Sequence, residues 1–379
     1  MVAHCAGMVD LVALPVWVGT LISKYGLDPQ QAGLLATLFL VGAVLASLAL
    51  APQFQHLSGR VVAAAGFGLA AAAFAGLSQV TEFGTMAALH AFAGLAAGAG
   101  LSVTHGTIAC SVHPHRLFAV VGIALGFFGI AFMGATPPLI AAHGGPLMFQ
   151  VFGALMGFAA IVAIFAFPAA DPVQNQPSGL SQSMSRMPRS VWFGIVGISG
   201  MALVQAMTFS FLERVGTERG FSVQAITMVL VALGVVNLFP AALAALLEKR
   251  WPAHGVLRAG PIVQALLVLV IVNVQDFAPY AAAASVFAAV MIFTHTFAFG
   301  LIAQLDPSGR ALAATPAMLM VGAAIGPILG GTLIKHLGYG SLSLAAVVVA
   351  VVAVACFARL PRPAASKVSA NSAQKAVTP

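Results

Sequence analysis

Residues 25–45 read YGLDPQQAGLLATLFLVGAVL, and this stretch decides the fold class of the chain. Asp28 is a residue type favoured immediately before a helix, and Pro29 suits the first helical position because its missing N–H is not needed there. The apolar run that follows continues to residue 51, and a helix of about 20 such residues crosses the roughly 30 Å of hydrocarbon in a bilayer. The stretch therefore predicts a membrane-spanning helix.

The whole chain shares this composition. Of its 379 residues, 60% are hydrophobic and 7% are charged, and the mean hydropathy is +1.02. A soluble domain carries about 25% charged residues, so soluble classes are excluded. The 16 Lys and Arg residues are scattered singly between apolar runs, which excludes a nucleic-acid-binding face. The three cysteines form no CxxC pair, so neither a disulfide framework nor a metal site is expected. The composition predicts an all-α polytopic membrane protein.

Twelve apolar segments are long enough to cross the membrane. They cover residues 1–22, 32–51, 61–79, 84–110, 117–141, 147–168, 191–212, 224–247, 256–273, 277–303, 311–334 and 340–359. Eleven or thirteen spans remain alternatives, because only a very short turn separates the ninth segment from the tenth. With the N-terminus inside, twelve Lys and Arg residues lie on the inner side and four on the outer side. Because short cytoplasmic loops retain Lys and Arg, we expect a multi-pass inner-membrane protein with both termini in the cytoplasm.

The chain divides into two related halves. Residues 169–190 are rich in Pro, Ser and Gln and predict a flexible cytoplasmic linker between six-helix bundles at 1–168 and 191–360, with a cytoplasmic tail at 361–379. GLDPQQA at residues 26–32 matches GFSVQAI at 220–226, 194 positions later. Arg116 and Arg310 are separated by the same 194 positions. A constant offset indicates a duplicated six-helix unit and therefore two pseudo-symmetric bundles.

Residues 25–45 and the segment LDPSGRALAATPAMLMVGAAIGPILGG at 305–331 resemble the major facilitator superfamily of transporters, and the resemblance covers nearly the whole chain. Gly322, Gly326 and Pro327, with the glycines at 330 and 331, match part of the family's motif C. The resemblance implies a secondary transporter that works by alternating access between its halves. It also implies that the first, fourth, seventh and tenth helices line the cavity. We interpret Gly322, Gly326 and Pro327 as helix-packing positions.

The resemblance places gating loops at two positions. Gly59 and Arg60 fit the family's loop between the second and third helices, although Pro52 and His56 replace its usual Gly and Asp. Asp306, Gly309 and Arg310 occupy the corresponding loop of the second half. The fourth span has no counterpart of the family's motif-B arginine, and the fifth has a degenerate motif C. The coupling mechanism of better-known members therefore does not transfer directly.

Asp10 is the one acid in the middle of a predicted span, and we interpret it as the proton-coupling residue. The alternatives are a neutral carboxyl bonded to a neighbouring helix, or a residue nearer the inner surface if Met1 is not the true start. The cavity-lining helices also carry polar residues, and a packed histidine is more often an interhelical hydrogen-bond partner than a ligand. We assign the substrate cavity to His90, Gln205, Thr294 and His295. At the outer end of the seventh span, two arginines are expected to pair with Glu213 and Glu218.

The sequence therefore predicts a proton-coupled secondary transporter that exports a small neutral, aromatic or cationic solute. Its partners are the solute, protons and the lipid bilayer; no nucleic acid, metal or cofactor is expected, and the monomer is expected to function. Proton-coupled uptake of a small organic acid is the alternative. A remote alternative is an intramembrane serine hydrolase, because GISG at residues 197–200 presents Ser199 as a nucleophile. Such a short pattern is expected by chance in a glycine-rich chain, so no enzyme activity is predicted.

Overall fold

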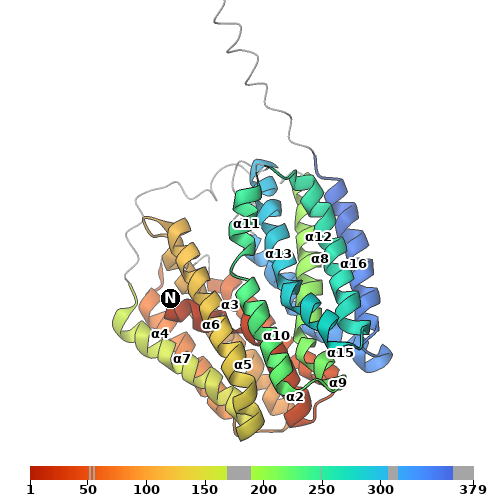
Figure 1. Cartoon of the computed structure of the whole chain (residues 1–379). Coiled ribbons are helices and arrows are strands. Elements are labelled where there is room, and N and C mark those ends of the chain that lie inside the picture. Colours follow the sequence, from red (N-terminus) through yellow and green to blue (C-terminus); the bar gives the residue numbers. More distant parts are fainter. Residues whose placement is uncertain (51–52, 54–55, 169–188, 249, 306–314, 362–379) are drawn as a thin grey trace, which may run out of the picture.

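The computed structural model describes residues 1–50, 53, 56–168, 189–248, 250–305 and 315–361, and its elements there are helices. Figure 1 shows two groups of helices side by side. The first half contains α1 (Val2–Gly7), α2 (Val9–Tyr25), α3 (Pro29–Leu50), α4 (Gly59–Leu77), α5 (Phe83–Ala109), α6 (Pro114–His143) and α7 (Pro146–Ala166). The second contains α8 (Arg189–Ser210), α9 (Leu212–Glu218), α10 (Val223–Val236), α11 (Pro240–Leu247), α12 (Ala253–Asn273), α13 (Phe277–Leu305), α15 (Thr315–Leu337) and α16 (Ser341–Ala358).

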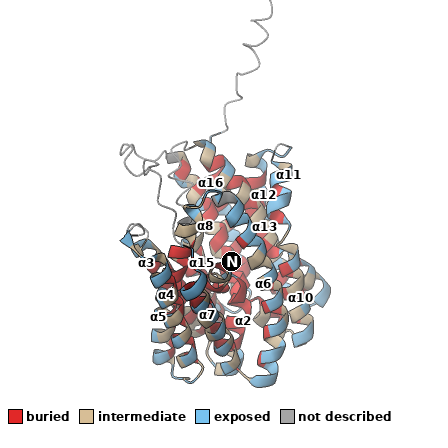
Figure 2. Ribbon diagram, turned by 90° about the vertical axis from the view of Figure 1, so that its left-hand side faces the viewer, coloured by how far each residue is buried: buried red, intermediate tan, exposed pale blue. Residues whose placement is uncertain are grey.

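Eleven helices of the described part are long and apolar enough to cross a membrane, and the twelve-helix fold class is confirmed. The remaining predicted span, the first, is not one continuous helix. It breaks at Met8 into the short α1 and the 17-residue α2. The eighth span also breaks, between Val236 and Pro240, where proline supplies no N–H for the helical ladder. Figure 2 shows buried residues on the inward faces and exposed residues on the outer faces, as expected for helices that contact lipid.

Equivalent turns support the duplication of the two halves. The side chain of Asp28 accepts a hydrogen bond from the N–H of Gln31 (2.9 Å) before α3, and Ser222 caps α10 in the same way through Ala225 (3.2 Å). The positive-φ glycines of the described residues form two pairs, Gly26 with Gly220 and Gly144 with Gly338. Each pair is 194 positions apart, the offset that the sequence predicts. A left-handed glycine ends a helix without steric cost, so the two halves turn at the same places.

The halves contact each other through α3 with α15 and through α6 with α10. The helices α3 and α10 begin, and α15 ends, at the same end of the bundle. We call this the far end, and it lies toward the bottom of Figure 1. At the far end Gly33 lies against the backbone carbonyl of Pro327, and Gly331 lies against that of Pro29. Two glycines thus allow α3 and α15 to approach at backbone distance.

Polar contacts reinforce this closure of the far end. Lys335 of α15 forms an ion pair with Asp28 (2.9 Å) and donates a hydrogen bond to Gln30 Oε1 (3.0 Å). Gln30 Nε2 also donates to the hydroxyl of Thr332 (3.2 Å). Every one of these bonds joins one half to the other, so the far end is shut in this structure.

Candidate functional site

A cavity of about 320 Å³ lies between the two halves. Its walls come from α2, α3 and α6 of the first half and from α8, α10, α13 and α15 of the second. Most of the lining side chains are Leu, Val, Ile, Met, Ala, Gly or Phe. The polar lining residues are Gln205, Asn237 and His295, and no Lys, Arg, Asp or Glu is among the residues described around it. The cavity is therefore mainly apolar, with three uncharged hydrogen-bonding groups.

Two of these groups are held by local hydrogen bonds. His295 Nδ1 lies 3.0 Å from the carbonyl oxygen of Met291, so it donates its proton there. In the neutral ring Nε2 is then an acceptor. Gln205 Oε1 accepts a long hydrogen bond from Gln264 Nε2 (3.4 Å), which also donates to the carbonyl of Met201 (3.1 Å). The bond from Gln264 to Gln205 fixes the direction in which the Gln205 amide points.

Asn237 is a lining residue that the sequence reasoning missed. It lies where the eighth span breaks between α10 and α11, and its Oδ1 atom is shielded from solvent without a hydrogen-bond partner among the described residues. A buried amide oxygen without a donor carries a desolvation cost, which a bound donor would remove. The signal was present in the sequence, because Asn237 interrupts an apolar span three residues before Pro240.

Asp10 lies beside the cavity, in the first turn of α2 immediately after the break at Met8. Its neighbours Leu11 and Val12 line the cavity, whereas Asp10 itself is 8% exposed and has an oxygen, Oδ1, without a hydrogen-bond partner. A helix N-terminus stabilises a negative charge, so this position in α2 favours an acidic side chain there. The broken first helix thus holds a buried carboxyl group next in sequence to residues that line the cavity.

His90 is placed differently from the expectation. It is fully buried in the first half, where Nε2 accepts a hydrogen bond from Trp17 Nε1 (3.3 Å) and Nδ1 donates to the carbonyl of Met86 (2.7 Å). Its ring also stacks on Trp17 and meets the edge of Phe149. Both ring nitrogens are therefore engaged within the bundle, and His90 is not among the residues that line the cavity. The structure thus places His90 in the interior of the first half and not in the wall of this cavity.

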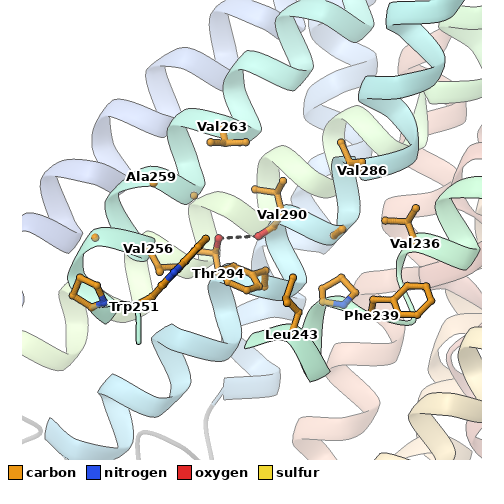
Figure 3. Close-up of a pocket in the computed structure, with 16 residues that line it drawn as sticks. Val236, Phe239, Leu243, Trp251, Val256, Ala259, Val263, Val286, Val290 and Thr294 are labelled. Carbon is orange, nitrogen blue, oxygen red and sulfur yellow. Dashed lines mark hydrogen bonds between the residues drawn. The ribbon is translucent and has the colours of Figure 1, made fainter. Parts of the chain in front are cut away.

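Thr294 also faces away from the cavity. It lies in an apolar groove of about 500 Å³ between α10, α11, α12 and α13, shown in Figure 3. Its hydroxyl donates to the carbonyl of Val290 (2.8 Å) and lies against Gly260. Phe239, Leu243 and Trp251 form much of the remaining wall. Thr294 thus belongs to this groove, while its neighbour His295 points into the cavity.

The predicted packing residues lie inside the second half, and the described gating residues lie at one end of the first half. Gly322 lies against the carbonyl of Ser199, and Gly326 lies against Ala206 and the backbone of Met207, so both face α8 within the second half. Gly59 begins α4, and Arg60 Nη2 donates to the carbonyl of Phe167 at the end of α7 (3.2 Å). Asp306, Gly309 and Arg310 lie outside the described residues.

Comparison with known proteins gives one family from the sequence and one fold from solved structures. The sequence model of the Major Facilitator Superfamily matches residues 1–308, and no curated protein matches the chain. Among solved structures, a bacterial homolog of the human lysosomal transporter Spinster, in an inward-facing and occupied conformation, is similar with a TM-score of 0.71 at 13% identity. That match covers 94% of this chain and 93% of the homolog.

Two further solved structures show the same architecture. A D-xylose–proton symporter matches with a TM-score of 0.71 at 15% identity, over 95% of this chain and 97% of the symporter. The nucleoside transporter NupG matches with a TM-score of 0.73 at 15% identity, over 94% and 96% of the two chains. At these identities the likeness shows the fold.

Proposed function

Because the chain belongs to the Major Facilitator Superfamily, whose members are transporters, we propose that it is a proton-coupled secondary transporter that exports a small, largely apolar solute. The observation that carries this proposal is the central cavity, which both halves line and whose polar groups are all uncharged. A solute held there would be reached from one side of the membrane when the halves close at the far end, and from the other side when they close at the opposite end. Alternating access therefore needs only a relative movement of the two halves.

The lining of the cavity supports the substrate class. Apolar walls favour a lipophilic body, and Gln205, Asn237 and His295 offer a small number of hydrogen bonds that fix its orientation. A sugar would present many hydroxyl groups to walls that cannot bond them. Uptake of an organic acid is also less well supported, because no Lys or Arg is among the residues described in the lining. We therefore favour a neutral or cationic aromatic compound.

Two features support the membrane orientation and the proton coupling in this proposal, and export is the direction that we propose with them. The far end is shut by the contact of α3 with α15, and we assign the far end to the outer side because the excess of Lys and Arg lies on the other side. Asp10 offers a buried carboxyl group near the cavity, and we assign to it the proton that exchanges for the solute. The linker and the tail would then lie in the cytoplasm, with 1–168 and 191–360 as the moving bundles.

A thermal-shift screen tests the proposal. Purified protein is screened against a panel of lipophilic compounds at pH 6 and pH 8, because a ligand that binds only the folded state raises the melting temperature. A hit should lose its effect in His295→Ala and keep it in Thr294→Val, the matched control one residue away that faces the groove. In Asp10→Asn the shift should lose its dependence on pH. Equal loss of binding in His295→Ala and Thr294→Val would contradict the assignment of the cavity.

A further inference from the structure

Glu213 is an acidic side chain held inside the far-end contact between the two halves. It belongs to α9, which packs against α2 of the other half and lies beside it in Figure 1. The carboxylate of Glu213 occupies the space in which a Cβ atom at position 19 of α2 would stand. Gly19 thus leaves a niche in one half, and a carboxyl group from the other half fills it.

Within the niche the two carboxyl oxygens have different surroundings. Oε1 shares the hydroxyl proton of Thr217 (3.2 Å) with the backbone carbonyl of Glu213 (3.0 Å). Oε2 is shielded from solvent and has no hydrogen-bond partner among the described residues. The adjacent cation, Arg214, forms its ion pair with Glu218 instead. An ionised carboxylate with a shielded, unpartnered oxygen carries a large desolvation cost, and the neutral acid carries much less.

The other charged and titratable groups around α9 leave this conclusion unchanged. From α13, the hydroxyl of Tyr280 donates to the carbonyl of Leu212 (2.8 Å), and Arg219 lies 5.9 Å from the centre of the Tyr280 ring. Tyr339, before α16, hydrogen-bonds to Arg214. On α2 the charged or titratable residues are Asp10, at the other end of the helix, Lys24 and Tyr25. α10 contains no titratable residue, and those of α8 and α12 lie at the opposite end of the bundle (Arg189, His254 and Arg258).

We propose that Glu213 is a proton-binding residue of the outer gate, whose protonated carboxyl group closes onto Gly19 and whose ionised form favours separation of the halves. The inference rests on the proposed function, because it gives the proton a role in the same alternating movement. When the far end opens, water reaches the carboxyl group and accepts its proton. When the far end closes again, the carboxylate takes up a proton from the same side of the membrane. The outer gate is thereby linked to external pH.

The size of the effect follows from the linkage of one proton. Between the pH values at which the carboxyl group titrates in the open and closed states, the ratio of closed to open molecules changes by up to about tenfold per pH unit. Closure increases as the pH falls, because the closed state holds one more proton. A purely structural role for Glu213 would change the stability of the protein without producing this profile.

Spin labels across the outer gate measure the ratio directly. Gln79 and Gln275 are exposed at the far end of opposite halves and serve as labelling sites, in a background in which Cys5, Cys110 and Cys356 are replaced by Ser. The distance distribution is recorded in lipid nanodiscs from pH 5 to pH 8. The wild-type background should shift toward the short distance as the pH falls. Glu213→Gln should hold the short distance at every pH. Glu218→Gln, the matched control on the same helix, should keep the wild-type profile.

A second variant keeps the test decisive if Glu213→Gln folds poorly. Gly19→Ala fills the niche and displaces the carboxyl group toward water, so it should flatten the pH profile while retaining every acidic residue. A wild-type profile in both Glu213→Gln and Gly19→Ala would overturn the role of Glu213 and leave the proposed transport intact. If the labels showed no movement between the halves at any pH or with any ligand, both the inference and alternating access would be contradicted.

Discussion

Replacing Gly331 with alanine should open the outer gate. A Cβ atom at this position would lie 2.7 Å from the carbonyl carbon of Pro29 and 2.9 Å from Cα of Gln30. These are backbone atoms of α3, so they cannot turn aside as a side-chain end can. The helices α3 and α15 must therefore separate at the far end.

The magnitude follows from the cost of overpacking. Inserting a methyl group into a close-packed contact costs about 1–3 kcal/mol. Because α15 forms in both the open and the closed state, the helix propensity of alanine affects the two states equally. The whole cost then falls on the closed state, and the ratio of closed to open molecules should fall by about 5- to 150-fold.

The distance between spin labels at Gln79 and Gln275 measures this ratio. Gly68→Ala is the matched control, because the nearest atom to its added Cβ would be 3.9 Å away, at ordinary contact distance. We expect a longer distance in Gly331→Ala and the wild-type distribution in Gly68→Ala. If Gly331→Ala kept the wild-type distribution, the contact of α3 with α15 would not be the closure of the far end.

Three further substitutions, at Asp28 and His90, test effects on the stability of the protein rather than on ligand binding. Partial burial alone would raise the pKa of Asp28, but hydrogen bonds from Gln31 and Lys335 and the charge of Lys335 hold it below its ordinary value of 3.8. Its stabilising effect is therefore present above about pH 4 and lost only as the pH falls further. At pH 7, Asp28→Asn should keep the helix cap and cost up to about 1 kcal/mol, while Asp28→Ala should cost about 1 kcal/mol more, both measured by thermal unfolding. His90→Leu leaves the Trp17 N–H without an acceptor and should cost about 1–3 kcal/mol without changing ligand affinity; lost affinity in a stable variant would contradict this.

The fold was predictable because its signals are local or periodic. Span length and polarity depend on composition alone, and the caps at Asp28 and Ser222 follow from residue type. The breaks were harder to predict. Hydropathy does not indicate where a helix is interrupted, so the first span was expected to be continuous although it breaks at Met8. The equivalent turns at Gly144 and Gly338 share the 194-residue offset, so they could have been predicted from the sequence.

The site was only partly predictable, because a helix turns by about 100° per residue and composition does not say which face meets the cavity. Thr294 and His295 are adjacent in sequence, yet one lines the groove and the other the cavity. His90 was assigned to the cavity because it is a polar residue of the fourth span, and no local pattern indicates its hydrogen bond with Trp17, 73 positions away. Glu213 falls one residue beyond the predicted seventh span, so it was interpreted as an interfacial partner of arginine, a pairing that the structure gives to Glu218 instead.

Transport in proteoliposomes tests the central claim most directly. The compound that stabilises the protein in the thermal screen is supplied to vesicles that contain the wild type, His295→Ala or Thr294→Val, with and without an imposed pH gradient. The account predicts that the wild type and Thr294→Val accumulate the compound only while the gradient lasts, and that His295→Ala does not. A compound that binds the cavity yet never moves across the membrane in the wild type, under any proton gradient, would contradict it.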